Sequence, residues 1–100
     1  MPGEYHALDH VANSLIQVGR FDEAITVFGE AAAISRETGQ RFLEASALND
    51  LGVALRKAGR LDEAITVHQE AAAISRETGN RHGEADVLAN LKADRAAQQT

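Results

Sequence analysis

The chain has 100 residues, no cysteine, and 15 acidic against 10 basic residues, which gives a formal net charge of −5. Without cysteine, disulfides, thiolate metal ligands and a cysteine nucleophile are excluded, and the acidic balance argues against nucleic acid as a partner. The N-terminus lacks the basic and apolar regions of a signal peptide, and no apolar run is long enough to span a membrane. We therefore expect a cytoplasmic protein that binds neither nucleic acid nor membranes.

Apolar residues recur with a helical period along the whole chain. In the first segment, Leu8, Val11, Ala12 and Leu15 lie at i, i+3, i+4 and i+7, the stripe of an amphipathic helix. A glycine follows each of the first four segments, which suits the left-handed conformation that ends many helices. The last segment begins with the same apolar pattern and then becomes polar. We expect five helices, at about 5–18, 21–38, 41–58, 61–78 and 81–97.

The central stretch of the chain occurs twice, 40 residues apart. Residues 19–45 and 59–85 are identical at 21 of 27 positions. A fixed period of this size indicates stacked helical units that bury their apolar faces against one another. The copies differ at Phe21/Leu61, Phe28/His68, Gly29/Gln69, Gln40/Asn80, Phe42/His82 and Leu43/Gly83. We expect one domain over 1–100, with repeat 1 at about 5–40, repeat 2 at about 45–80 and a polar capping helix at about 81–97.

Small and apolar residues recur at fixed positions in both copies. The positions are Leu8, Val11, Ala12, Leu15, Ala24, Phe28 and Ala31 in the first copy, and Leu48, Leu51, Gly52, Leu55, Ala64, His68 and Ala71 in the second. This spacing resembles the tetratricopeptide repeat, whose signature is Trp, two residues, Leu-Gly, two residues, Tyr, then Ala, three residues, Phe, and a later Pro. The chain departs from it with leucine at the Trp and Tyr positions, with Arg36 and Arg76 at the Pro position, and with a period of 40 rather than 34. The longer form is similar to the arrays of kinesin light chains and of bacterial multidomain regulators.

The resemblance implies an all-α fold, a right-handed solenoid of about two and a half helix-turn-helix repeats. The recurring positions are then core residues, and the first helices of successive repeats line a concave face. Polar residues on these helices can hydrogen-bond the backbone of a peptide. The candidate peptide-binding residues are Asp9, Asn13, Gln17, Asn49, Asp50, Val53, Arg56, Lys57, Asp86 and Asn90.

The charge of this concave face narrows the kind of partner. Members of the family that dock chaperones hold a C-terminal carboxylate with lysine, arginine and asparagine side chains on three repeats. The matching positions here hold Asp9 and Asn13, then Asp50, then Asp86 and Asn90. Three carboxylates would repel a carboxylate ligand. We therefore expect a basic or neutral protein or peptide as partner.

The four histidines do not form a predicted metal site. His6 and His10 lie at i and i+4 and are the one candidate pair, but the pattern provides no third ligand. His68 and His82 replace Phe28 and Phe42 of the earlier copy. The phenylalanines are expected between the repeats, and the histidines near the C-terminal edge with incomplete burial; alternatively, their protonation near pH 6 loosens the last helix.

No catalytic constellation is apparent, because the His, Asp and Glu residues fall on repeat positions or on outer helix faces. We expect a non-catalytic interaction module without a cofactor, which binds a partner on the concave face. Two alternatives stay open. The chain is either a self-associating structural protein, which dimerises through the uncovered first helix or by helix exchange, or an excised sensor fragment of a larger regulator.

Overall fold

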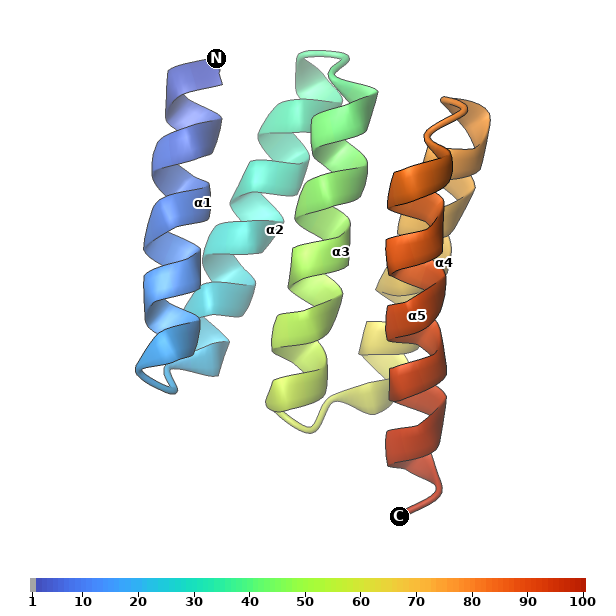
Figure 1. Cartoon of the computed structure of the whole chain (residues 1–100). Coiled ribbons are helices and arrows are strands. Elements are labelled where there is room, and N and C mark those ends of the chain that lie inside the picture. The colour runs from blue at the N-terminus through green and yellow to red at the C-terminus, as the bar shows by residue number, and fades with distance from the viewer. Residues whose placement is uncertain (1) are drawn as a thin grey trace.

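The computed structural model describes the backbone of residues 2–100 and the side chains of residues 8–100. This part of the chain is entirely helical apart from short turns (Figure 1). The helices are α1 (Pro2–Gln17), α2 (Phe21–Glu37), α3 (Arg41–Lys57), α4 (Leu61–Glu77) and α5 (Arg81–Gln98). The all-α prediction is confirmed, and each helix end lies close to the position expected from the periodicity. None of the described helices is long and apolar enough to cross a membrane.

The turns between the helices follow one design. The glycine after α3, Gly59, has a φ of 82°, a left-handed conformation that costs glycine little. Its amide donates to the Arg56 carbonyl at 2.9 Å, and the amide of Arg60 donates to the Leu55 carbonyl at 2.8 Å. These are the two hydrogen bonds of a Schellman motif. A left-handed glycine follows each of the first four helices, and these turns reverse the chain so that successive helices are antiparallel.

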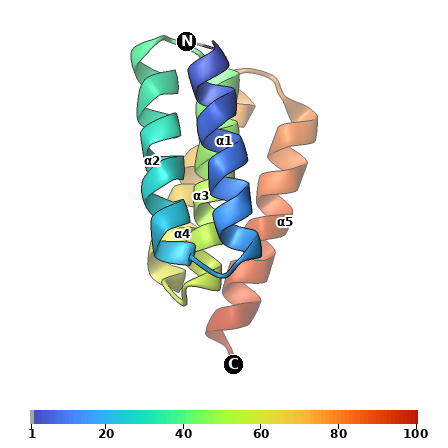
Figure 2. The same cartoon turned by 90° about the vertical axis from the view of Figure 1, so that its left-hand side faces the viewer.

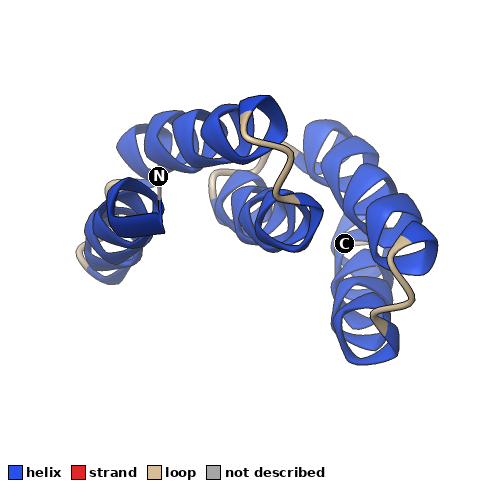
Figure 3. Ribbon diagram, turned by 90° about the horizontal axis from the view of Figure 1, so that it is seen from above, coloured by secondary structure: helices blue, strands red, loops and turns tan. Residues whose placement is uncertain are grey.

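Successive helices pack side by side in two layers. Each helix contacts the next one along the chain, and α3 also contacts α5 directly. Seen from above, α2 and α4 lie on the outer side of a curved double row, and α1, α3 and α5 lie on its inner side (Figures 2 and 3). The shortest extent of the molecule is 18 Å, which suits two layers of helices. We call the surface formed by α1, α3 and α5 the inner face.

Alanine and glycine allow the helices to approach closely. Ala12, Ala24, Ala54 and Phe28 form one buried cluster between the first three helices. At the corresponding place in the second repeat, Gly52 lies against the ring of His68. A Cβ atom on Gly52 would come within 2.3 Å of that ring, so any larger residue would force α3 and α4 apart.

Ion pairs add to the packing along one edge of the array. The Glu44 carboxylate is buried and is held by Arg36 of α2 at 3.0 Å and by Arg41 of α3 at 2.9 Å. Arg76 and Glu84 repeat the first of these pairs at 2.9 Å. The two copies are also alike on exposed helix surface: Thr26 and Thr66 are both exposed, and each donates to the carbonyl four residues earlier.

Two of the aromatic and histidine predictions are wrong. Phe42 does not lie in the core between the repeats; it is 57% exposed, because it lies on the side of α3 that faces the start of α5. His68 is completely buried (0% exposed) rather than partly exposed at the edge. The exposed position predicted for His82 agrees with the structure.

The burial of His68 depends on α5. Its Nδ1 atom is hydrogen-bonded to the Asp94 carboxylate at 2.5 Å, and Nε2 donates to the main-chain carbonyl of Asn49 at 3.1 Å. Arg56 donates to the second carboxylate oxygen of Asp94 at 2.8 Å and to the Asn90 carbonyl at 3.2 Å. Among the described residues, every buried polar side-chain atom has a hydrogen-bond partner. This polar network joins α3, α4 and α5 and fixes the position of α5.

Candidate functional site

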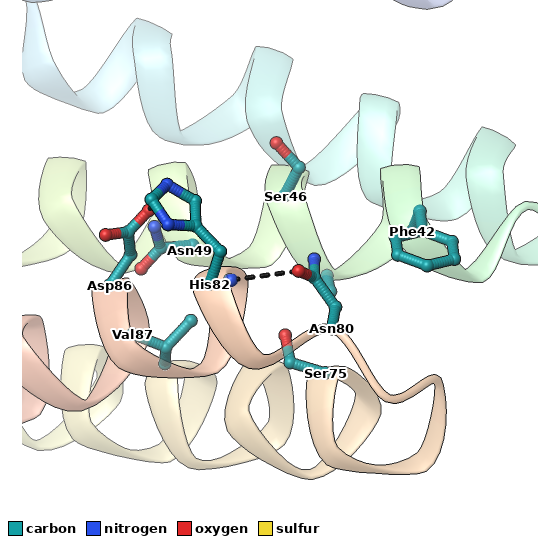
Figure 4. A pocket seen from close by; sticks show the side chains of 10 residues that line it. Phe42, Ser46, Asn49, Ser75, Asn80, His82, Asp86 and Val87 are labelled. Atoms are coloured by element: carbon teal, nitrogen blue, oxygen red, sulfur yellow. Dashed lines mark hydrogen bonds and ion pairs between the residues drawn. The ribbon is translucent and has the colours of Figure 1, made fainter.

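A pocket of about 220 Å³ lies between α3 and α5, with α4 beneath it (Figure 4). Because α4 belongs to the outer layer, the pocket opens onto the inner face. Its lining residues are Phe42, Ala45, Ser46, Asn49, Ser75, Asn80, His82, Gly83, Asp86 and Val87. We call this the α3–α5 pocket.

Helical spacing brings the α3 side of the pocket together. Phe42, Ala45, Ser46 and Asn49 lie at i, i+3, i+4 and i+7, so they share one helix face. Ala45 is buried, whereas Phe42 and Ser46 are exposed. The α3 wall therefore changes along its length from an aromatic ring, through a hydroxyl group, to an amide.

Asn80 and Gly83 shape the α5 side of the pocket. The Asn80 side chain accepts a hydrogen bond from the Gly83 amide at 3.0 Å and so caps the start of α5. A Cβ atom on residue 83 would lie 2.4 Å from the Asn80 amide nitrogen, so the cap in this position needs glycine. The earlier copy has Leu43 at this position, and that leucine packs against the core. The second copy thus has a capping hydrogen bond and no side chain where the first has an apolar side chain.

The pocket carries negative charge and has no fixed cation. Asp86 is exposed, and the nearest basic group in an ion pair with it is the exposed His82 ring, 3.8 Å away. No lysine or arginine is among the lining residues. Asn49 and Asn90 connect α3 to α5 next to this carboxylate, since the Asn90 amide donates to the Asn49 side-chain oxygen at 2.9 Å. The pocket can therefore form hydrogen bonds with a ligand and can attract a positively charged group.

A second acidic position lies between α1 and α3. The pKa of Asp50 is raised from its ordinary value of 3.8 to about 7, mainly by burial and also by the charge of Asp9 and a hydrogen bond between the two carboxyl groups. Asp50 therefore holds a proton below neutral pH, and its own negative charge is then absent from this part of the inner face. The prediction that Asp50 points outward is wrong in part, because its side chain is largely enclosed.

The other predicted site residues are spread along the inner layer. Asn13 is exposed on α1 and donates to the Asp9 carbonyl at 2.9 Å; Gln17 and Lys57 are exposed, and Val53 is half-buried. Arg56 is not available to a ligand as predicted, because it is 22% exposed and is paired with Asp94. Of the ten predicted residues, the structure places Asn49 and Asp86 together in the α3–α5 pocket.

Phe42, Ser46, Asn80 and Gly83 line the pocket but were not among the predicted site residues. A signal for them was present, since the pairs Gln40/Asn80, Phe42/His82, Leu43/Gly83 and Ser46/Asp86 all differ between the two copies. The sequence alone did not show that Phe42 and Ser46 are exposed. Their exposure follows from the neighbouring helix rather than from their own sequence.

The His6 side chain of the candidate metal pair lies outside the described residues. Within residues 8–100, no three His, Asp or Glu side chains come together in a way that could hold a metal ion. In the pocket, Ser46 and His82 are not hydrogen-bonded to each other, so the serine has no base beside it there.

Comparison with known protein families agrees with this architecture. The family model of the tetratricopeptide repeat matches residues 4–77 and, a second time, residues 43–99. The second match is displaced by about one repeat, as expected for a chain whose halves are alike. A search among curated proteins finds no match. Together the two family matches cover nearly the whole chain, and the protein belongs to the tetratricopeptide repeat family.

Proposed function

We propose that this domain is a non-catalytic interaction module that holds a protein or peptide partner on its inner face. Family members generally serve as protein-interaction modules. The observation that carries the choice of face is the α3–α5 pocket, which is hollowed into the inner layer and lined by exposed Phe42, Ser46 and Asp86. The 40-residue period, similar to that of kinesin light chain and bacterial regulator arrays, supports a role in scaffolding.

The charge of the inner face favours a basic or neutral partner. Asp9, Asp50 and Asp86 lie on α1, α3 and α5 respectively, and the whole chain has a net charge of −5. Arg56, which would have balanced them, is used by Asp94 inside the fold. An acidic segment would meet like charge along this face, whereas a basic one would meet complementary charge.

Selection of binders from a random-peptide library tests this proposal. We expect the wild-type domain to enrich peptides with a positive net charge, and the variant Asp9→Asn/Asp86→Asn to bind them about tenfold more weakly, since two charges opposite the peptide are lost. Glu30→Gln is the matched control, because Glu30 is an exposed carboxylate of the outer helix α2. Equal losses in both variants, or enrichment of acidic peptides, would refute binding on the inner face.

Self-association is a second candidate function. Val11 and Val18 are 48% and 69% exposed, on α1 and just after its end. A partner molecule covering these side chains would bury apolar surface that is now in contact with water. This alternative needs no ligand pocket and predicts a mass that depends on concentration.

A further inference from the structure

The α3–α5 pocket has two chemically different ends. Phe42 lies at one end, and Asn49, His82 and Asp86 lie at the other, with Ser46 and Asn80 between them (Figure 4). Phe42 and Asn49 are seven residues apart on one helix, and a helix rises about 1.5 Å per residue, so the two ends are about 10 Å apart. An extended peptide advances about 3.3 Å per residue. The pocket therefore spans about three residue steps of an extended peptide.

Three of the six differences between residues 19–45 and 59–85 lie at this pocket, and a fourth lies just beyond that stretch. Asn80, His82, Gly83 and Asp86 all line it, and they replace Gln40, Phe42, Leu43 and Ser46 of the earlier copy. An added carboxylate and a missing leucine side chain are the changes with most consequence for a ligand. The first adds a negative charge to the pocket, and the second removes an apolar side chain from its wall.

Each end selects one type of side chain. The Phe42 ring is 57% exposed, and covering it with an apolar side chain removes apolar surface from water. At the other end, Asp86 has no lysine or arginine beside it in the pocket. The amide oxygen of Asn49 and the imidazole of His82 lie next to it. A cation there gains an opposite charge and further hydrogen-bond acceptors.

We propose that the α3–α5 pocket binds an extended peptide segment in which an apolar residue lies against Phe42 and a lysine or arginine, about three positions away, pairs with Asp86. This inference rests on the proposed function and specifies the partner sequence at one place on the inner face. The rest of the partner contacts α1 and the remainder of α3.

Blocked tetrapeptides test this directly, without a known partner. The probes are acetyl-Leu-Gly-Gly-Arg-amide, the reversed acetyl-Arg-Gly-Gly-Leu-amide, and versions with glutamine or glutamate in place of arginine. Binding is measured by titration with the amide NMR signals of Gly83 and Asp86. We expect at least one arginine peptide to bind about fivefold more tightly than its glutamine version, as for one exposed ion pair, and the glutamate version to bind more weakly still.

Variants separate the two ends of the pocket. Asp86→Ser, the residue of the earlier copy, should remove the preference for arginine over glutamine and leave the contribution of leucine. Phe42→Ala should weaken arginine and glutamine peptides by the same factor. Both side chains are exposed, so the thermal melt should be unchanged, and Glu30→Gln should bind like the wild type.

The outcomes of this test differ from those of the library selection. If the arginine peptides bind no better than the glutamine peptides, or if Asp86→Ser keeps the preference, the pocket inference is overturned even when library peptides bind the inner face. If the tetrapeptides bind as expected while the library yields no charge-dependent binder, the pocket assignment stands and the wider function fails. Loss of all binding in both experiments overturns both.

Discussion

A single carboxyl group links the charge of the inner face to the stability of the fold. Asp50 has a pKa of about 7, raised mainly by burial and then by the charge of Asp9. In the unfolded chain the value returns to about 3.9, so the native state binds more protons between these two values. The stabilisation is complete below the unfolded-state pKa and is lost as the pH rises through about 7. Folding stability should therefore fall across this window.

Substitution of Asp50 by asparagine should remove this pH dependence. We expect the free energy of unfolding of Asp50→Asn to exceed that of the wild type at pH 8, and the difference to disappear towards pH 4. Within the window the difference changes by at most about 1.4 kcal/mol per pH unit. Urea unfolding at several pH values measures it, with Glu30→Gln as control. A difference that is constant with pH would show that Asp50 titrates as an ordinary exposed carboxyl group.

The buried pair of residues that joins two helices is chemically different in the two repeats. Phe28 and Ala54 share an apolar cluster in the first repeat, and His68 and Asp94 occupy the corresponding places 40 residues later. The apolar contact is thereby replaced by a buried hydrogen bond. Asp94 is 0% exposed, and a buried carboxylate is tolerated only when it is paired. Arg56 meets this need, and the first repeat has Ile16 in its place.

Substituting Asp94 alone should lower the free energy of unfolding far more than substituting Asp94 and His68 together. Asp94→Ala leaves His68 and Arg56 without their shared acceptor, and we expect a loss of about 3–5 kcal/mol in the free energy of unfolding. The double variant His68→Phe/Asp94→Ala reproduces the apolar pair of the first repeat and should recover most of that loss. Urea unfolding of the two variants gives the comparison.

A transplanted pair provides the matched control. Phe28→His/Ala54→Asp places the same two residues in the first repeat, where Ile16 cannot supply a positive charge. This variant should be less stable than the wild type, although the same pair, His68 and Asp94, is tolerated in the second repeat. If it folds as stably as the wild type, Arg56 is not needed for burial of the carboxylate, and the network has another explanation.

For the molecule as a whole, the repeat pattern was enough to predict the architecture. Glycines 20 residues apart locate the ends of the first four helices to within a few residues, and the 3.6-residue period locates the described helices themselves, because both act locally. The burial of His68 could not be predicted, since its partner Asp94 is 26 residues away and meets it only once α5 has docked. Likewise, Asn49 and Asp86 were recognised as candidates, but the pocket they share depends on the missing side chain at Gly83.

The mass in solution distinguishes a binding module from a self-associating protein. We expect sedimentation to give a mass near 10.7 kDa at micromolar concentration. The exposed large apolar side chains of the described residues are Val11, Val18, Phe42 and Leu88, spread over three regions of the chain. A standard interface buries about 800 Å² on each partner, which scattered single residues do not supply. A dimer that Val18→Lys converts to monomer would favour self-association through α1 instead.

The likeness of α2 and α4 extends to residues that packing does not constrain. Thr26 and Thr66, and likewise Ala33 and Ala73, are exposed in both helices, and an exposed position accepts many residue types with little effect on stability. Identical residues at these positions are therefore explained by common descent of the two copies and not by a packing requirement. We infer that residues 19–45 and 59–85 descend from one duplicated segment, because positions within them that packing leaves free have stayed alike. Within this segment, four of the six differences lie at the α3–α5 pocket or at the buried histidine, so these two sites are where the two copies have come to differ most.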